Sequence, residues 1–315
     1  MKTQTLEAFA TPLERVDSVL AGPWRGPRQM LAEQSYDSHA SIHDDATAQK
    51  LGFKGGTIEG PTHFSQFAPL GEAVFGRDWF TRGCVSAHYR TVVYEGEEVR
   101  AFMGEPDAAG LAPIWMTKRD GAEVLRGTAS VGDAGPTALE TRLASLAPLE
   151  EPVLLSGLEV GRKGPRHEVS MAADQHMGEL YPFTLTRKLE RITEPSSWYA
   201  GASPFGGAII PVEMISVLLA YSSRVGGFAV RGPSVGLFAD QEIRLRDGPL
   251  FVGERFEIER EIVALSGGKR TESVWVRTRC YRPGATAPAA EMLLNSATLK
   301  ESYANYESDR AALYG

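Results

Sequence analysis

The sequence predicts an α+β protein in which two antiparallel sheets each wrap around a long central helix. The motif Gly55-Gly56-Thr57-Ile58 returns 151 residues later as Gly206-Gly207-Ala208-Ile209. An apolar helical segment follows each copy, and four segments with strand-like alternation follow each helix. A helix and a sheet each have an apolar side to bury, and one sheet wrapped around one helix buries both.

The first half supplies its elements in order. Ser41 is expected to cap a short helix that ends at Gly52, and Pro61 to begin the buried central helix, which runs to Val74. From residue 85 onward, apolar residues recur at every second position. This alternation predicts strands over residues 85–93, 98–103, 114–119 and 124–131.

The second half repeats this order. A helix is expected over residues 211–223, and strands over 235–240, 255–263, 271–278 and 292–298. Residues 133–166 are rich in Ala, Pro, Gly and Glu, which is typical of a linker. We therefore expect an N-terminal unit over 1–135, a linker over 136–179 and a C-terminal unit over 180–315. Placed edge to edge, the units would pair their sheet edges and form a pseudo-dimer within one chain.

Composition excludes several classes of protein. The chain has 33 Lys and Arg against 40 Asp and Glu, a net charge of −7, and no basic block, so no nucleic-acid partner is expected. No apolar run approaches the ~18 residues that span a membrane, so a cytoplasmic protein without a membrane partner is expected. Cys84 and Cys280 are expected to be buried free thiols. The sequence has no zinc spacing, no dinucleotide fingerprint and no P-loop, so neither a metal nor a cofactor is expected.

Residues 37–60 resemble the signature of a known family. The segment from Asp37 to Phe53, followed by Thr57-Ile58-Glu59-Gly60, is similar to the MaoC-like dehydratases, or (R)-specific enoyl-CoA hydratases. Their signature is D-x-N-P-x-H, then A-x-x-x-G-F, then I-x-H-G. The organisation of nearly the whole chain resembles their double hotdog fold. The resemblance implies a carbon–oxygen lyase that acts on an acyl thioester of coenzyme A or of an acyl carrier protein, and it implies a homodimer.

The signature fits in two registers. Aligned on its A-x-x-x-G-F part, Asp37 falls on the family aspartate, His39 on the asparagine and Ile42 on the catalytic histidine. Aligned on His43 instead, Ser38 falls on the aspartate. A shift of one residue turns a side chain by about 100° in a helix, so the two registers predict different sites.

The resemblance implies roles for these residues. Asp37 and one of the two histidines, His39 or His43, would hold the catalytic water and move its protons. Glu59 stands where the family has its second histidine, and would either replace it as an acid/base group or mark a different reaction. The N–H of Gly60, at the start of the central helix, would polarise the thioester carbonyl.

Other candidates are expected to bind the substrate. His63 lies one turn inside the central helix, and Trp198 and Phe205 are expected near the mouth of an acyl-chain tunnel. There is no histidine between residues 185 and 210, so the N-terminal half is expected to carry the chemistry and the C-terminal half to shape the tunnel. Each of these residues could instead have a purely structural role. Asp37 could cap a turn, and His39 and His43 could be exposed surface residues. His63, Trp198 and Phe205 could simply pack in the core.

Two other functions stay open. Glu59 near a helix start would suit a hotdog acyl thioesterase, in which a carboxylate directs water to the carbonyl. The departures from the D-x-N-P-x-H pattern would suit a non-catalytic acyl-binding or partner subunit. A fold alone does not choose among these functions.

Overall fold

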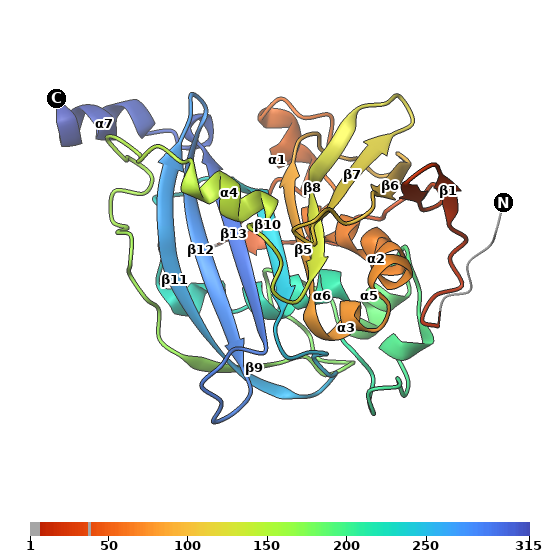
Figure 1. The fold of residues 1–315 in the computed structure, drawn as a ribbon. Coiled ribbons are helices and arrows are strands. Elements are labelled where there is room, and N and C mark those ends of the chain that lie inside the picture. The colour runs from red at the N-terminus through yellow and green to blue at the C-terminus, as the bar shows by residue number, and fades with distance from the viewer. Residues whose placement is uncertain (1–6, 37–38) are drawn as a thin grey trace.

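Eleven strands form one continuous antiparallel sheet in the computed structural model of the protein, which describes residues 7–36 and 39–315 (Figure 1). The strand order is β1-β2-β6-β7-β8-β5-β10-β13-β12-β11-β9, and β3 and β4 form a separate hairpin. The strands are β1 (Glu14–Val16), β2 (Val19–Ala21), β3 (Ser35–Tyr36), β4 (His39–Ala40), β5 (Gly83–Tyr89), β6 (Val99–Met103), β7 (Ala112–Lys118), β8 (Glu123–Val131), β9 (His167–Ser170), β10 (Gly236–Leu245), β11 (Arg255–Gly267), β12 (Thr271–Tyr281) and β13 (Ala290–Leu299).

Short helices connect and cover these strands. The α-helices are α1 (Asp45–Lys50), α2 (Phe67–Phe75), α3 (Asp78–Arg82), α4 (Ala138–Ala144), α5 (Leu185–Leu189), α6 (Val212–Ala220) and α7 (Tyr306–Tyr314). The 3₁₀ helices are η1 (Gly60–Gln66), η2 (Ser197–Tyr199), η3 (Ser223–Gly226) and η4 (Lys300–Ser302). Within the described ranges, no helix is both long enough and apolar enough to cross a lipid bilayer.

The two predicted sheets join edge to edge into one continuous sheet. β5, from the first half, pairs with β10, from the second, in a register that runs from Cys84↔Arg244 to His88↔Asp240. The predicted pairing of the two sheet edges is therefore found, and the adjoining edges satisfy each other's backbone groups across this seam. Each strand expected from the period-two alternation is present, with bounds that differ by a few residues.

The central helices are shorter than predicted. The first half of the segment expected from Pro61 to Val74 is the 3₁₀ helix η1, and only α2 is α-helical. Pro69 explains this change because it has no N–H to donate to the carbonyl of Ser65, so a regular α-helical bond cannot form there. α6 likewise ends at Ala220, before the predicted end at residue 223. The prediction of long central helices is therefore wrong in length, although both apolar segments are buried as expected.

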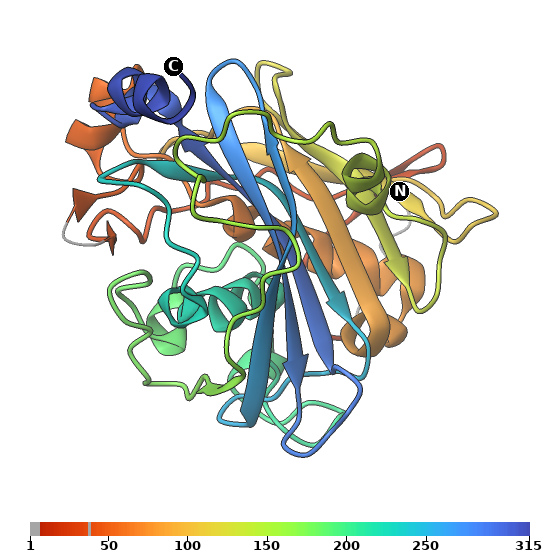
Figure 2. The ribbon, with the colours of Figure 1, turned by 90° about the vertical axis from the view of Figure 1, so that its left-hand side faces the viewer.

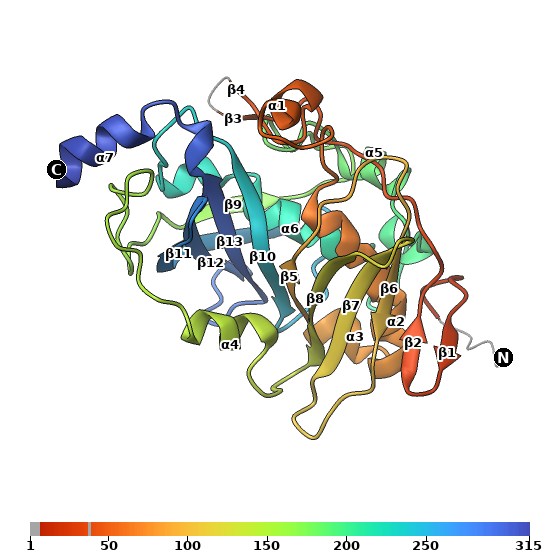
Figure 3. The ribbon, with the colours of Figure 1, turned by 90° about the horizontal axis from the view of Figure 1, so that it is seen from above.

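The sheet curves around these helices. Viewed from above, α2, α5 and α6 lie on one side of the sheet and α4 lies on the other (Figure 3). Figure 2 shows the segment after α4 running past the strands of the C-terminal half. There the Leu149 N–H donates to the Leu265 carbonyl, and the Val153 N–H donates to the carboxylate of Glu272. The division at residues 135 and 180 into two units and a linker stays a prediction.

The start of α1 differs from the prediction in a way that matters for the histidines. Asp44, rather than Ser41, caps α1, and its carboxylate accepts a hydrogen bond from the Thr47 N–H at 2.8 Å. The Ser41 hydroxyl instead accepts from the His43 N–H at 3.1 Å. His39 lies in β4, so the two histidines do not share a helical face.

Self-association is a prediction that the single chain leaves open. We expect light scattering at micromolar concentration to give twice the chain mass of 34.2 kDa, because the resemblance to the MaoC-like dehydratases implies a homodimer. A mass of one chain over that concentration range would contradict the homodimer.

Candidate active site

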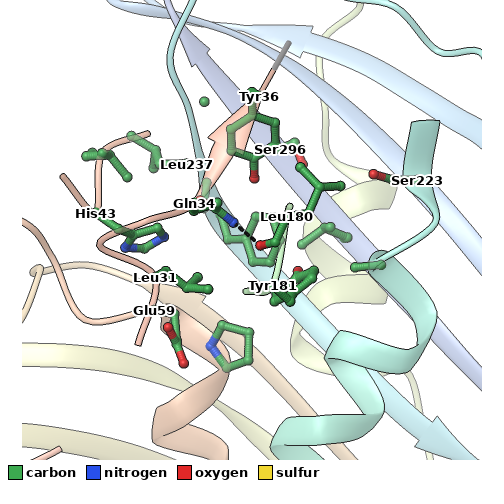
Figure 4. Close-up of a pocket in the computed structure, with 18 of the residues that line it drawn as sticks. Leu31, Gln34, Tyr36, His43, Glu59, Leu180, Tyr181, Ser223, Leu237 and Ser296 are labelled. Atoms are coloured by element: carbon green, nitrogen blue, oxygen red, sulfur yellow. Dashed lines mark hydrogen bonds between the residues drawn. The ribbon is translucent and has the colours of Figure 1, made fainter. Parts of the chain in front are cut away.

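A cavity of about 1020 Å³ lies where the two halves of the chain meet. Its N-terminal wall comes from residues within 31–36, 39–43, 57–63 and 89–93, and its C-terminal wall includes residues of α6, β10, β11, β12 and β13. η1 and α6 pack against each other beneath it. Figure 4 shows His43 and Glu59 on the same side of the cavity, with Tyr181 opposite them. The cavity can therefore present groups from both halves to one ligand.

His43 is held as a neutral imidazole with one nitrogen free. Its Nδ1 lies 2.7 Å from the carbonyl oxygen of Thr57, and since a carbonyl only accepts, Nδ1 carries the hydrogen. Nε2 is then the unprotonated nitrogen, and it makes no hydrogen bond to any described residue. Burial lowers the pKa of His43, and the negative charge of Glu59 opposes this effect. His43 can therefore accept a proton on Nε2 near neutral pH.

Glu59 lies in a buried cluster with Lys188. The amine of Lys188, in α5, donates to Oε1 of Glu59 and, at 2.7 Å, to the hydroxyl of Thr62. That hydroxyl in turn donates to Oε1 of Glu59 at 2.9 Å. Oε2 of Glu59 has no partner within the part of the chain that the structure describes. The carboxylate is therefore fixed through one oxygen and keeps hydrogen-bonding capacity at the other.

Glu213, at the start of α6, completes the cluster from the other half. Its Oε2 lies 3.7 Å from the amine nitrogen of Lys188, and the side chain is 1% exposed. Burial raises the pKa of Glu213 to about 7; Lys188 opposes this shift and the charge of Glu59 adds to it. For Lys188, burial alone would lower the amine pKa, but the charges of Glu59 and Glu213 outweigh it and the pKa is raised. The cluster therefore combines a fixed ammonium with a carboxyl that titrates near neutral pH.

We expect Glu213→Gln to raise stability at about pH 8 and to flatten its dependence on pH. The pKa of the folded carboxyl, about 7, lies above its ordinary value of 4.5, so its stabilising contribution is fully present below pH 4.5 and is lost as pH rises through about 7. Each unit of pKa difference corresponds to ~1.4 kcal/mol. The free energy of unfolding of wild type should therefore fall by about 3 kcal/mol as pH rises, and that of the amide variant should not. Urea unfolding of both proteins across this range measures the difference, and parallel curves would contradict the assignment.

At Gly60, the start of η1 packs against the ring of Tyr89. A Cβ at Gly60 would lie 2.7 Å from Cζ of the Tyr89 ring, which is held by a 3.0 Å hydrogen bond from its hydroxyl to Gln241. The N–H of Gly60 makes no hydrogen bond to the described residues, as expected at the first position of a helix. Gly60 lines the cavity, so this N–H is a candidate donor to an oxygen atom of a ligand.

Gly60→Ala should therefore disturb the site. The new methyl group must displace Tyr89 or the helix start, which should cost about 1–3 kcal/mol of stability and, since a shift of ~1 Å can matter that much, up to about 100-fold in turnover. Gly157→Ala is the matched control, because a Cβ there meets nothing within 4 Å. Equal stability and activity in the two variants would show that the contact with Tyr89 does not constrain the site.

Comparison with known proteins identifies the fold. A putative MaoC domain protein dehydratase from Chloroflexus aurantiacus J-10-fl matches with a TM-score of 0.51 and 16% identity over 95% of each chain. A conserved hypothetical protein from Mycobacterium tuberculosis, described as having a double hotdog fold, matches with a TM-score of 0.50 and 11% identity over 88% of this chain and 94% of that one. This chain has a double hotdog fold. The predicted resemblance to MaoC-like dehydratases is thus confirmed at the level of fold.

Other comparisons add little to this double hotdog assignment. The dehydratase domain of PpsC from Mycobacterium tuberculosis, solved in complex with C12:1-CoA, gives a TM-score of 0.46 and 10% identity over 93% of this chain and 98% of that one. No protein-family model matches the sequence, and no curated protein matches it.

The double hotdog brings together some of the predicted site residues and separates others. His39 lines the cavity; its Nε2 lies 2.9 Å from the carbonyl oxygen of Ser234, and its buried Nδ1 has no partner among the described residues. His63 also lines the cavity, and burial lowers its pKa to about 4, so it is neutral. Asp37 lies outside the described residues, and its catalytic role stays a prediction. Among residues 7–36 and 39–315, no group of His, Cys, Asp or Glu is arranged to hold a metal ion.

Trp198 and Phe205 are not found at the mouth of the cavity. They are absent from the described lining and pack with Phe80 instead, with ring centroids 5.1 and 6.2 Å from it. Core packing accounts for both, so we no longer place them at the substrate. Cys84 and Cys280 are buried free thiols, as predicted.

Two cavity residues were missed by the sequence analysis. Glu213 interrupts an apolar segment at the position that corresponds to Thr62 in the first copy of the repeat, and this charge in a buried helix was a usable signal. Lys188 had no such signal, because it lies in an ordinary polar stretch. The expectation that the second half contributes only shape is therefore incomplete, since both residues come from that half and line the cavity.

Proposed function

We propose that the protein is a carbon–oxygen lyase that hydrates an enoyl thioester, or dehydrates a 3-hydroxyacyl thioester, in this cavity. The observation that carries the proposal is the hydrogen bond from His43 Nδ1 to the Thr57 carbonyl, which leaves Nε2 as a proton acceptor beside the charge of Glu59. The Gly60 N–H at the same wall supplies a donor for the thioester oxygen. Acid–base catalysis next to an oxyanion donor is what this reaction requires.

Each step of hydration can be assigned to these groups. Nε2 of His43 takes one proton from water as the water oxygen bonds to the β-carbon of the substrate. The electron pair of the double bond moves onto the thioester oxygen, which the N–H of Gly60 holds. The imidazolium then gives its proton to the α-carbon, so one water has been added and His43 is neutral again.

Glu59 and Lys188 support His43 electrostatically in this scheme. The negative charge of Glu59 favours the imidazolium that forms during the reaction, as it already opposes the effect of burial on the pKa of His43. Lys188 and Thr62 fix the position of that charge. Because Oε1 of Glu59 accepts both of these hydrogen bonds and Oε2 is buried, we favour this supporting role over the direct attack or water activation that a thioesterase would need.

The cavity suits an acyl chain. Apolar side chains of α6, β12 and β13 form part of its wall: Val217, Leu219, Val274, Val276, Met292 and Leu294. We propose that the N-terminal half supplies the groups that move protons, and that the C-terminal half supplies Lys188, Glu213 and the apolar wall.

Two thioesters test the proposal against its rivals. We expect crotonyl-CoA to lose its enoyl absorbance without release of thiol, and butyryl-CoA to remain unchanged. Thiol release from either compound would favour a thioesterase. No change in either, although both bind, would favour a non-catalytic acyl-binding protein.

A further inference from the structure

Arg260 is a buried cation on the cavity wall that has no acidic partner among the described residues. It lies in β11, is 3% exposed and lines the cavity. Its guanidinium donates to the carbonyl oxygens of Leu219 at 2.6 Å and Ser222 at 3.1 Å, and to the Ser222 hydroxyl at 3.2 Å. All three acceptors are neutral, and Nε makes no hydrogen bond to the described residues.

The other basic side chains of the lining are each paired with a carboxylate. Those pairs are Arg90–Glu123, Lys188–Glu59 and Arg224–Glu179. For Arg260, no carboxylate within residues 7–36 and 39–315 makes an ion pair. Buried charges are normally paired, since an uncompensated one is costly, so the absence of a partner among the described residues points to an anionic group of a ligand.

A structural role explains only part of this arrangement. The carbonyls that Arg260 contacts lie at the end of α6, where an arginine can cap the helix. That cap uses both terminal nitrogens, but the helix end offers only a partial negative charge. Burial lowers the pKa of Arg260 to about 10, and Tyr181 and Tyr221 oppose this effect, so the guanidinium stays charged at neutral pH.

The position of Arg260 relates it to the proposed catalytic groups. Burial raises the pKa of Tyr181; the charge of Glu59 adds to this shift and Arg260 opposes it. The hydroxyl of Tyr181 therefore interacts electrostatically with both Glu59 and Arg260, which come from different halves of the chain. Glu59 and Arg260 line the same cavity, and apolar side chains of β12 and β13 form part of its wall.

We propose that Arg260 binds a carboxylate at the end of the acyl chain remote from the thioester, so that the substrate is a monothioester of a dicarboxylic acid. This inference rests on the proposed function and names its substrate class. The carboxylate would accept a hydrogen bond from Nε of the guanidinium and supply the negative charge that the described residues do not.

Binding of saturated thioesters tests this inference without turnover. Calorimetry would compare succinyl-, glutaryl- and adipyl-CoA with butyryl-, pentanoyl- and hexanoyl-CoA, which match them in chain length. We expect at least one dicarboxylic thioester to bind about 10- to 100-fold more tightly than its neutral counterpart, the gain typical of a charged hydrogen bond. Arg260→Gln should remove this preference with little change for the neutral compound. Arg90→Gln, which alters another arginine of the lining, should keep it.

A second variant guards against a folding defect in Arg260→Gln. Thr278 is the cross-strand partner of Arg260 and also lines the cavity. Thr278→Glu should give Arg260 an internal counter-ion and remove the preference while the guanidinium and its cap remain. Preference that persists in either folded variant overturns the inference.

The outcomes separate this inference from the proposed reaction. If wild type shows no preference in any pair, the Arg260 site is overturned, whether or not crotonyl-CoA is hydrated. If wild type shows the preference but no enoyl thioester is hydrated, the carboxylate site stands and the reaction is wrong. Affinity for none of the thioesters overturns both.

Discussion

His43→Gln is expected to lower kcat for hydration of an enoyl thioester by about 10²–10⁴-fold, the contribution of a positioned acid/base group. Glutamine can still donate to the Thr57 carbonyl, so the hydrogen bond that places the side chain is kept. It has no nitrogen that accepts a proton near neutral pH. Steady-state kinetics and circular dichroism on the same preparation would measure the loss and show that the fold is intact.

His39→Gln is the matched control for this variant. Nε2 of His39 lies against the Ser234 carbonyl, and an amide can replace that hydrogen bond. We expect its kcat to stay within about tenfold of wild type, because no proton transfer depends on it. A larger loss in His39→Gln than in His43→Gln would assign the catalytic imidazole to the other histidine.

The pH profile gives a second test of His43. The neutral imidazole is the active form, and burial lowers its pKa from the ordinary value of 6.5. Activity of wild type should therefore fall only as pH drops below 6.5, through the lowered pKa of this histidine. An acidic limb centred above 6.5 would contradict the assigned environment.

Lys188→Met is expected to cost about 3–5 kcal/mol of stability, the size seen when one partner of a buried ion pair is removed. The variant leaves Glu59 and Glu213 buried side by side without their ammonium. Because the pKa of Glu213 is about 7 with the ammonium present, the cost should be larger above this pH, where both carboxyls are ionised. Denaturant unfolding below and above that pH measures it.

A double variant checks the reason for the loss. Lys188→Met with Glu213→Gln removes one of the two charges and should recover part of the stability above neutral pH. Activity should remain low, because Glu59 still lacks the hydrogen bond from Lys188. If Lys188→Met alone costs less than about 1 kcal/mol, as surface pairs do, the buried cluster does not have the assigned charges.

The sequence predicts the elements of this fold and the pairing of two sheet edges, but not which strands pair. Period-two alternation locates the strands because one face of each is buried, and the offset repeat locates both central segments. The choice of β5 and β10 as the paired edges, and their register, depends on contacts between residues far apart in the chain, and no local pattern encodes this. The 3₁₀ start of the first central helix follows from Pro69, which cannot donate to the carbonyl of Ser65, and the apolar pattern alone does not show it.

In the candidate site, too, the sequence predicts residues that lie close together in the chain better than contacts between distant residues. Glu59 and His43 come from a local motif, and the structure places both at the cavity. Which ring nitrogen of each histidine is occupied depends on acceptors from elsewhere in the chain, the Thr57 carbonyl for Nδ1 of His43 and the Ser234 carbonyl for Nε2 of His39. Lys188 reaches Glu59 from 129 positions away, so only the fold brings it into the site.

The most direct test follows the oxygen atom of water. Crotonyl-CoA would be incubated with the protein in water labelled with the heavy isotope of oxygen, and the products analysed by mass spectrometry. Hydration through His43 predicts one heavy oxygen in the 3-hydroxyacyl chain of an intact thioester, and much less label with His43→Gln. Heavy oxygen in a free carboxylic acid, with release of coenzyme A, would contradict the lyase and assign the cavity to thioester hydrolysis.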